Sequence, residues 1–191
     1  ATLSNNTIGN GNTGVGQFTM RLNTSGNNNT AFGSQASRNN LTGEQNTAIG
    51  FNALYSNLNS FNVGIGSESL STLTSGTYNT SLGVNSGKIL VDGNDNTISN
   101  NSLYIGSDTR SLANNQTNEI VIGYGAFGSG TNTVTLGNDN ITQTNLKGAI
   151  TFKTQFATSG SGVANGSLFY GTDGALYFKG GSGTVTMIAP N

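Results

Sequence analysis

One short phrase recurs through the first three quarters of this chain, and it constrains the fold more than any other feature. The phrase runs Asn-Thr-Ala-apolar-Gly, as in NTAFG, NTAIG and NTSLG. The glycines that end its successive copies are Gly9, Gly16, Gly33, Gly50, Gly66, Gly83, Gly106, Gly123 and Gly137. From Gly16 onward they are separated by 17, 17, 16, 17, 23, 17 and 14 residues. Such a period predicts similar units that stack in line, because one short unit cannot bury its apolar face alone.

Each unit predicts a strand of three to five residues that ends at its glycine. Ala48 and Gly50 flank Ile49, so we expect Ile49 to point into a narrow interior. Asn46 and its equivalents can bond their own backbone or stack from coil to coil as an amide ladder. The residues expected to carry the structural repeat are Ile49, Gly50, Ile65, Gly66, Leu82, Gly83, Ile105, Gly106, Ile122, Gly123, Leu136 and Gly137.

These units predict an all-β protein. Residues 1–147 are expected to form a parallel β-solenoid, or β-roll, of about 17-residue coils. Each coil would rise ~4.8 Å through parallel strand pairing. The chain shows no sustained apolar period of 3.6 residues, so no helix is expected. The longest interval coincides with GKILVDGNDNTIS, which is typical of an insertion.

Residues 148–191 have a different character and predict a small antiparallel β-meander. Three apolar and aromatic runs, 167–170, 175–179 and 184–189, are separated by GTDG and GGSG turns. A sheet this small has too little core to be stable alone. We therefore expect it to pack on the solenoid or, in preference, on copies of itself as a trimerisation module within a symmetric oligomer. Phe18, Leu58 and Phe61 in the coil loops would then be interface residues, or else cover their own coils.

Composition excludes several functional classes. Charged residues make up 8% of the 191 residues and the net charge is −1, against roughly 25% charged residues in average proteins. The few Lys and Arg residues do not cluster, so nucleic acid is not an expected partner. No apolar run approaches the roughly 20 residues of a membrane span. The chain has no His and no Cys, which removes histidine triads, zinc sites and thiolate chemistry. We expect no enzyme activity and no cofactor.

Two motifs suggest chemistry at first sight. EIVIGYGAFG, at residues 119–128, has the glycine spacing of a dinucleotide loop, but it is a copy of the repeat and no helix follows to hold a pyrophosphate. VDGNDN, at 91–96, lacks the further ligands of a calcium loop and is expected to be a solvated turn. Paired carboxylates could hydrolyse a glycan, although isolated surface acids are the simpler interpretation. The candidate acids are Asp92, Asp95, Asp108 and Asp139.

Aromatic residues concentrate in the predicted meander and suggest a receptor-binding site. Aromatic rings beside hydrogen-bonding groups suit sugars, so the candidates are Tyr170, Asp173, Tyr177 and Lys179. The alternative interpretation is that these aromatics form the trimer core of the meander.

Two resemblances extend this interpretation. NTAIG-FNAL, NTAFG-SQAS and NTSLG-VNSG resemble the head repeats of YadA-like trimeric autotransporter adhesins, which wind as a left-handed parallel β-roll. LGNDNITQTNLKGAITF and SLFYGTDGALYFKGGSGTVTMIA look like the distal ends of bacteriophage fibre and appendage proteins. Together they imply a homotrimeric virion fibre, in a virion or extracellular location, that joins other virion proteins and attaches to a host-surface glycan or receptor.

Three alternatives stay open. A bacterial surface adhesin head could have the same fold, and a polysaccharide-degrading tailspike would add enzyme activity. An ice-binding solenoid is suggested by Thr30, Thr47 and Thr80, which recur at one position per coil. The change from Thr47 to Val63 and the variable loop lengths argue against a regular threonine array.

Overall fold

A computed structural model describes residues 1–147, 155–156, 167–171, 173, 175–179, 182 and 184–189. The chain forms two compact units, Ala1–Thr142 and Gln143–Asn191, and each is considered by itself. Every regular element among the described residues is a β-strand, which confirms the all-β prediction. Over that same part of the chain there is no helix long and apolar enough to cross a membrane.

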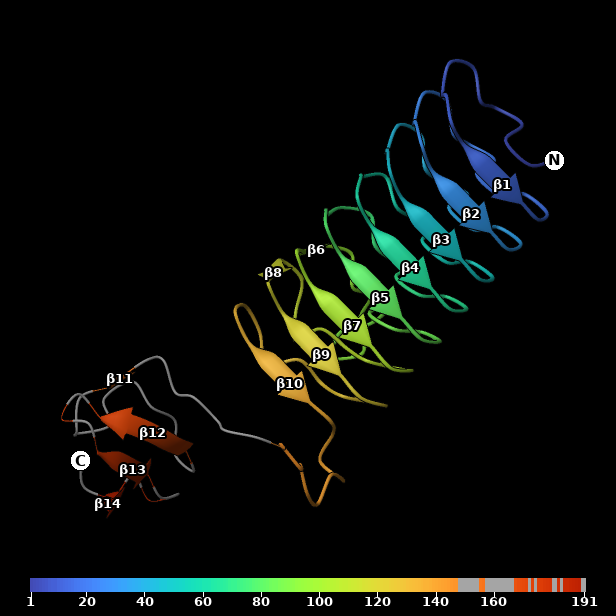
Figure 1. Cartoon of the computed structure of the whole chain (residues 1–191). Coiled ribbons are helices and arrows are strands. Elements are labelled where there is room, and N and C mark those ends of the chain that lie inside the picture. Colours follow the sequence, from blue (N-terminus) through green and yellow to red (C-terminus); the bar gives the residue numbers. More distant parts are fainter. Residues whose placement is uncertain are drawn as a thin grey trace. The chain divides into compact units, whose positions relative to one another are not determined.

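The first unit is a parallel β-solenoid, as the repeat predicts (Figure 1). Each coil contributes one three-residue strand to an eight-stranded sheet, and the strands follow one another in chain order. Equivalent residues lie in register, as in the pairing of Thr30 with Thr47 and of Phe32 with Ile49. The strands are β1 (Thr13–Val15), β2 (Thr30–Phe32), β3 (Thr47–Ile49), β4 (Val63–Ile65), β5 (Thr80–Leu82), β7 (Leu103–Ile105), β9 (Ile120–Ile122) and β10 (Val134–Leu136).

The predicted insertion lies between β5 and β7. It contains an antiparallel bridge between Ile89 and Asp95, closed by a hydrogen bond of 2.8 Å from the amide of Leu90 to the carbonyl of Asn94. The chain then returns to the solenoid through β6 (Ser99–Asn100), which pairs in parallel with β8 (Gln116–Thr117) in the next coil. The extra residues are therefore accommodated without a break in the main sheet.

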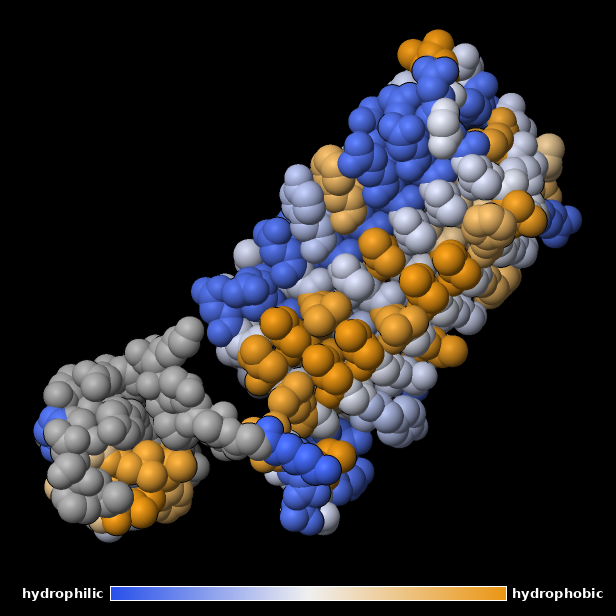
Figure 2. All heavy atoms as spheres, in the orientation of Figure 1, coloured by the Kyte–Doolittle hydropathy of each residue, from blue (hydrophilic) through white to orange (hydrophobic). Residues whose placement is uncertain are grey.

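The strand side chains point the opposite way from our expectation. Ala48 is fully buried, whereas Ile49 is 39% exposed. Because side chains alternate along a strand, only the middle residue of each three-residue strand faces the interior. The large aliphatic residues of the repeat therefore lie outside, and Figure 2 shows apolar side chains along the strand-bearing side of the solenoid.

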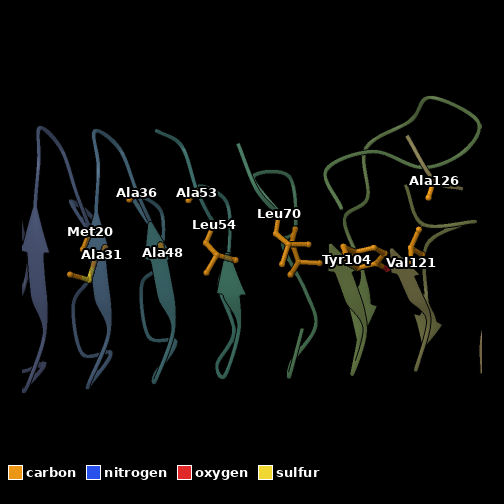
Figure 3. Packing of buried hydrophobic residues seen from close by; sticks show 11 residues of the cluster. Met20, Ala31, Ala36, Ala48, Ala53, Leu54, Leu70, Tyr104, Val121 and Ala126 are labelled. Carbon is orange, nitrogen blue, oxygen red and sulfur yellow. The ribbon is translucent and has the colours of Figure 1, made fainter. Parts of the chain in front are cut away.

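The interior of each coil has room for few large side chains. A methyl group added to Gly64 would lie 2.9 Å from Cγ of Leu54, closer than packed carbon atoms approach. Small residues such as Ala31 and Ala48 therefore share the core with a few large ones such as Leu54 and Tyr104 (Figure 3). The buried apolar cluster comprises Met20, Ala31, Ala36, Ala48, Ala53, Leu54, Leu70, Leu73, Tyr104, Val121 and Ala126.

A ladder of buried asparagines runs beside this core, as predicted. Nδ2 of Asn46 donates to Oδ1 of Asn29 at 3.1 Å, and Oδ1 of Asn46 accepts from the amide of Asn62 at 2.9 Å. Asn62 bonds Asn79 in the same way, with distances of 3.0 and 3.1 Å. The ladder pairs buried backbone amides in the turns before the strands, where no strand partner exists.

The second unit contains the predicted meander. Strands β12 (Ser167–Gly171), β13 (Leu176–Lys179) and β14 (Val185–Ala189) pair antiparallel in that order. A short strand, β11 (Gln155–Phe156), pairs in parallel with β12. Ala175 and Tyr177 are buried and pack against Val185, so the described core of this sheet is very small.

Candidate functional site

The most extensive functional candidate is the outer face of the solenoid sheet, formed by the first and third residues of each strand. These residues share one face because a strand has a side-chain period of two. The first positions are Thr13, Thr30, Thr47, Val63, Thr80, Leu103, Ile120 and Val134. The third positions are Val15, Phe32, Ile49, Ile65, Leu82, Ile105, Ile122 and Leu136.

This outer face is uncharged and predominantly apolar. Every third-position residue is aliphatic or aromatic, and none is fully buried. The first positions change from mostly threonine in the early coils to Leu103, Ile120 and Val134 in the last three strands. Figure 2 shows the resulting apolar stripe, which widens toward β7, β9 and β10. Contiguous apolar surface of this kind marks an interaction site in soluble proteins.

The register of the strands also bears on the ice-binding alternative, which needs a regular array of threonines. Thr13, Thr30 and Thr47 are direct neighbours in the sheet, but Val63 separates Thr47 from Thr80. The third positions of these strands hold aliphatic residues or Phe32 in place of a second threonine column. The regular array of paired threonines that this alternative requires is therefore not present on the outer face.

Two aromatic residues flank the outer face. The rings of Phe61 and Tyr78 stack with centroids 4.8 Å apart and planes 5° apart. Both residues have positive φ, 64° and 60°, in a position that other coils fill mainly with Asn, Gln or Gly. Stacking of ~0.5–1.5 kcal/mol offsets part of the strain of placing aromatic residues there. Phe61 and Leu58 are both about two-fifths exposed and Phe18 is half-buried, and the prediction that these three residues form an interface stays a prediction.

A pocket of ≈ 400 Å³ is lined by the chain segments that directly follow β7, β9 and β10. We call these segments arcs. Its lining includes the rings of Tyr124 and Phe127 and the guanidinium of Arg110, which lies 5.1 Å from the centroid of Phe127. Nε of Arg110 is buried and has no hydrogen-bond partner among the described residues. Asp108 and Asp139 add two carboxylates to the same pocket.

Sequence reasoning named all four candidate acids but could not show which meet. Asp108 and Asp139 line one pocket although they are separated by two coils of chain. Asp92 lies in the exposed insertion, where hydrogen bonds from the backbone and side chain of Asn94 lower the pKa of its carboxyl. Over the described residues, no group of three or more acids is placed to hold a metal ion.

The dinucleotide-like glycines belong to a solenoid coil. Gly123 follows β9, and Gly125 lies in the arc after it with a φ of 58°. The described chain continues from there into a turn and then β10, so no helix follows the glycines. This confirms that EIVIGYGAFG is a copy of the repeat.

The candidate receptor residues of the meander have unequal environments. Tyr177 is only 6% exposed, and its hydroxyl donates to Oδ2 of Asp173 at 2.5 Å. This bond lowers the pKa of the Asp173 carboxyl and raises that of the Tyr177 phenol. Lys179 is half-buried in β13, and the backbone of Tyr170 pairs with Leu176, while the side chain of Tyr170 lies outside the described residues. Tyr177 therefore lies in the core of its own meander, while the receptor-binding and trimer-core interpretations of these aromatics both stay predictions.

A buried carboxylate was missed by the sequence analysis. Glu119 occupies an asparagine-ladder position and is fully buried. Its oxygens accept from the hydroxyl of Ser111 at 2.7 Å, the amide of Gly130 at 2.8 Å and, at longer distances, the amide of Leu112 and the hydroxyl of Tyr104. Burial raises the pKa of the Tyr104 phenol. Four donors satisfy the carboxylate, so Glu119 is a structural residue that replaces the amide ladder.

Comparison of the chain with protein-family models, with curated proteins and with solved structures finds no match.

Proposed function

We propose that this chain is a non-enzymatic attachment fibre module of a virion, built as a homotrimer whose protomers meet through the outer face. The observation that carries the proposal is the uncharged apolar stripe along all eight strands. A stripe of this length would be costly to leave in water, at ~25 cal/mol for each Å² of apolar area. Further copies of the same chain fit it best, because no charge has to be desolvated when two such faces meet.

The number of protomers and the biological setting rest on the sequence resemblances. YadA-like head repeats assemble as trimers, and the C-terminal segment looks like phage fibre ends. A fibre needs length and rigidity, and it needs no catalytic groups. In-line stacking of coils on a continuous hydrogen-bonded ladder supplies length and rigidity. A bacterial adhesin head would use the same assembly, and neighbouring capsid and tail genes would distinguish the virion fibre from it.

Solution mass tests the assembly. We expect light scattering to give a trimer for the full chain and a monomer for Leu82→Glu, which places a charge in the middle of the outer face. Leu41→Glu is the matched control, because Leu41 and Leu82 are similarly exposed, 44% and 48%, but Leu41 lies in a loop outside the strands. A full chain that is monomeric, or a trimer that survives Leu82→Glu, would overturn the proposed interface.

A further inference from the structure

We propose that the pocket between the arcs after β7, β9 and β10 binds a neutral saccharide. This inference rests on the proposed attachment function for its biological meaning and gives that function a specific site in the solenoid. The pocket lies entirely within the first unit. Its volume is within the ~300–1,000 Å³ range of small-molecule sites.

The pocket lies where a column of equivalent side chains, one from each successive coil, lacks one member. The second residue after the repeat glycines from Gly16 to Gly123 has positive φ, and before Gly125 it always carries a side chain, as in Asn85 and Asp108. Gly125 takes this position after β9 with the same backbone conformation. A Cβ added there would meet only Nδ2 of Asn138, at 3.9 Å. Sterics therefore do not demand a glycine, and the missing side chain leaves the space above Asp108 open.

The aromatic groups suit the apolar face of a sugar ring. Tyr124 is 73% exposed, the most exposed large apolar or aromatic side chain of the described residues. Phe127 is also exposed, and its ring is backed by Arg110, which fixes its orientation through a cation–π contact. An exposed aromatic ring beside polar groups is the usual combination where one ligand side is apolar and the other forms hydrogen bonds.

The polar side chains of the pocket supply both hydrogen-bond donors and hydrogen-bond acceptors. The carboxylates of Asp108 and Asp139 accept hydrogen bonds, and the guanidinium of Arg110 donates them. Oδ1 of Asp108 is held by Nδ2 of Asn85 at 2.9 Å, so this carboxylate is oriented before a ligand arrives. Arg110 forms no salt bridge within the described part of the chain. Vicinal hydroxyls of a sugar would satisfy these groups together.

The charge balance selects a neutral ligand. The lining carries two carboxylates and one guanidinium, which leaves a net negative charge. A sugar with a carboxylate, sulfate or phosphate group would be repelled by that excess. Neutral hexoses and N-acetylhexosamines are therefore the expected class.

Saturation-transfer NMR on the full chain tests the site with D-glucose, D-galactose, D-mannose, N-acetyl-D-glucosamine and, as the anionic probe, N-acetylneuraminic acid. We expect at least one neutral sugar to bind, with at least tenfold weaker affinity in Tyr124→Ala and in Asp139→Asn. Tyr78→Ala is the matched control, since Tyr78 is 58% exposed and lies outside the pocket; it should bind as the unchanged chain does. Circular dichroism would verify that each variant is folded.

The outcomes separate this site from the proposed assembly. Binding of none of the neutral sugars, equal loss in Tyr124→Ala and Tyr78→Ala, or preference for N-acetylneuraminic acid would overturn the saccharide site. A trimeric mass in those same samples would leave the proposed fibre intact. Conversely, a sugar-binding monomer would support the site and overturn the trimer.

Discussion

At the scale of single residues, the repeat glycines determine how closely successive coils approach. Their φ angles are 127° at Gly66 and 140° at Gly83, a region that side-chain-bearing residues rarely adopt. The amide of Gly66 donates to the carbonyl of Ile49 at 2.7 Å, in the coil before it. A Cβ on Gly66 would lie 2.3 Å from the carbonyl oxygen of Gly83, in the coil after it. Backbone conformation and close stacking therefore both require glycine.

Gly66→Ala should be strongly destabilising. We expect a loss of at least ~2 kcal/mol in the free energy of unfolding, because strained φ and a backbone clash add together. Urea denaturation at one fixed protein concentration measures it. Gly125→Ala is the matched control, with φ of 58° and no neighbour closer than 3.9 Å, and should cost only ~1 kcal/mol. Equal losses in the two variants would show that coil stacking does not depend on Gly66.

At the scale of the strand, the sequence indicates the element but not the direction in which it faces. The spacing of the glycines predicts the strand positions, and Asn46 predicts the ladder. The three-residue pattern Thr47-Ala48-Ile49 allows two orientations, however, and our prediction placed the larger apolar residue inside. In this coil Ala48 and Leu54 together fill the interior, which leaves Ile49 for the outer face. Hydrophobicity alone does not decide between burial in the fold and burial against a partner.

The pocket was not predicted from the sequence. Asp108 and Asp139 were candidates only as isolated acids, and Tyr124 was not singled out. They come together because three successive arcs are stacked in register and because Gly125 contributes no side chain. A usable signal was present: Gly125 stands where the preceding coils carry side chains such as Asn85. An alignment of the repeats by position would have exposed that gap.

The asparagine ladder is expected to stabilise the turns that precede the first five strands of the solenoid sheet, β1 to β5. Asn46→Ala removes the acceptor of the Asn62 amide and the donors to Asn29 and to the carbonyl of Asn59. Leaving such buried groups unpaired costs ~1–3 kcal/mol each, so we expect a loss of at least ~2 kcal/mol in the free energy of unfolding. Asn5→Ala, at an exposed position, should change it by less than ~0.5 kcal/mol. A similar small change for Asn46→Ala would contradict the proposed support.

At the scale of the whole molecule, a solenoid is close to one-dimensional. Each coil contacts only the coils before and after it, and every strand of the eight-stranded sheet pairs with its neighbours in sequence order. Stability should therefore be close to a sum over coils and the interfaces between them. The variation from 14 to 23 residues between repeat glycines is tolerated because the differences fall in the loops, while the strands keep their register.

This architecture predicts that one complete coil can be removed. Deletion of residues 34–50 joins Gly33 to Phe51, so that β2 would stack directly on β4 and Oδ1 of Asn29 would accept from the amide of Asn62 in place of Asn46. We expect a folded, shorter solenoid with unchanged β-type circular dichroism. Deletion of residues 34–42 removes only part of a coil. The repeat glycine and the ladder asparagine of the shortened coil could then no longer both align with those of the neighbouring coils, so we expect this variant not to fold. If both deletions unfold the chain, the coils are not interchangeable units, and stability depends on contacts between non-adjacent coils.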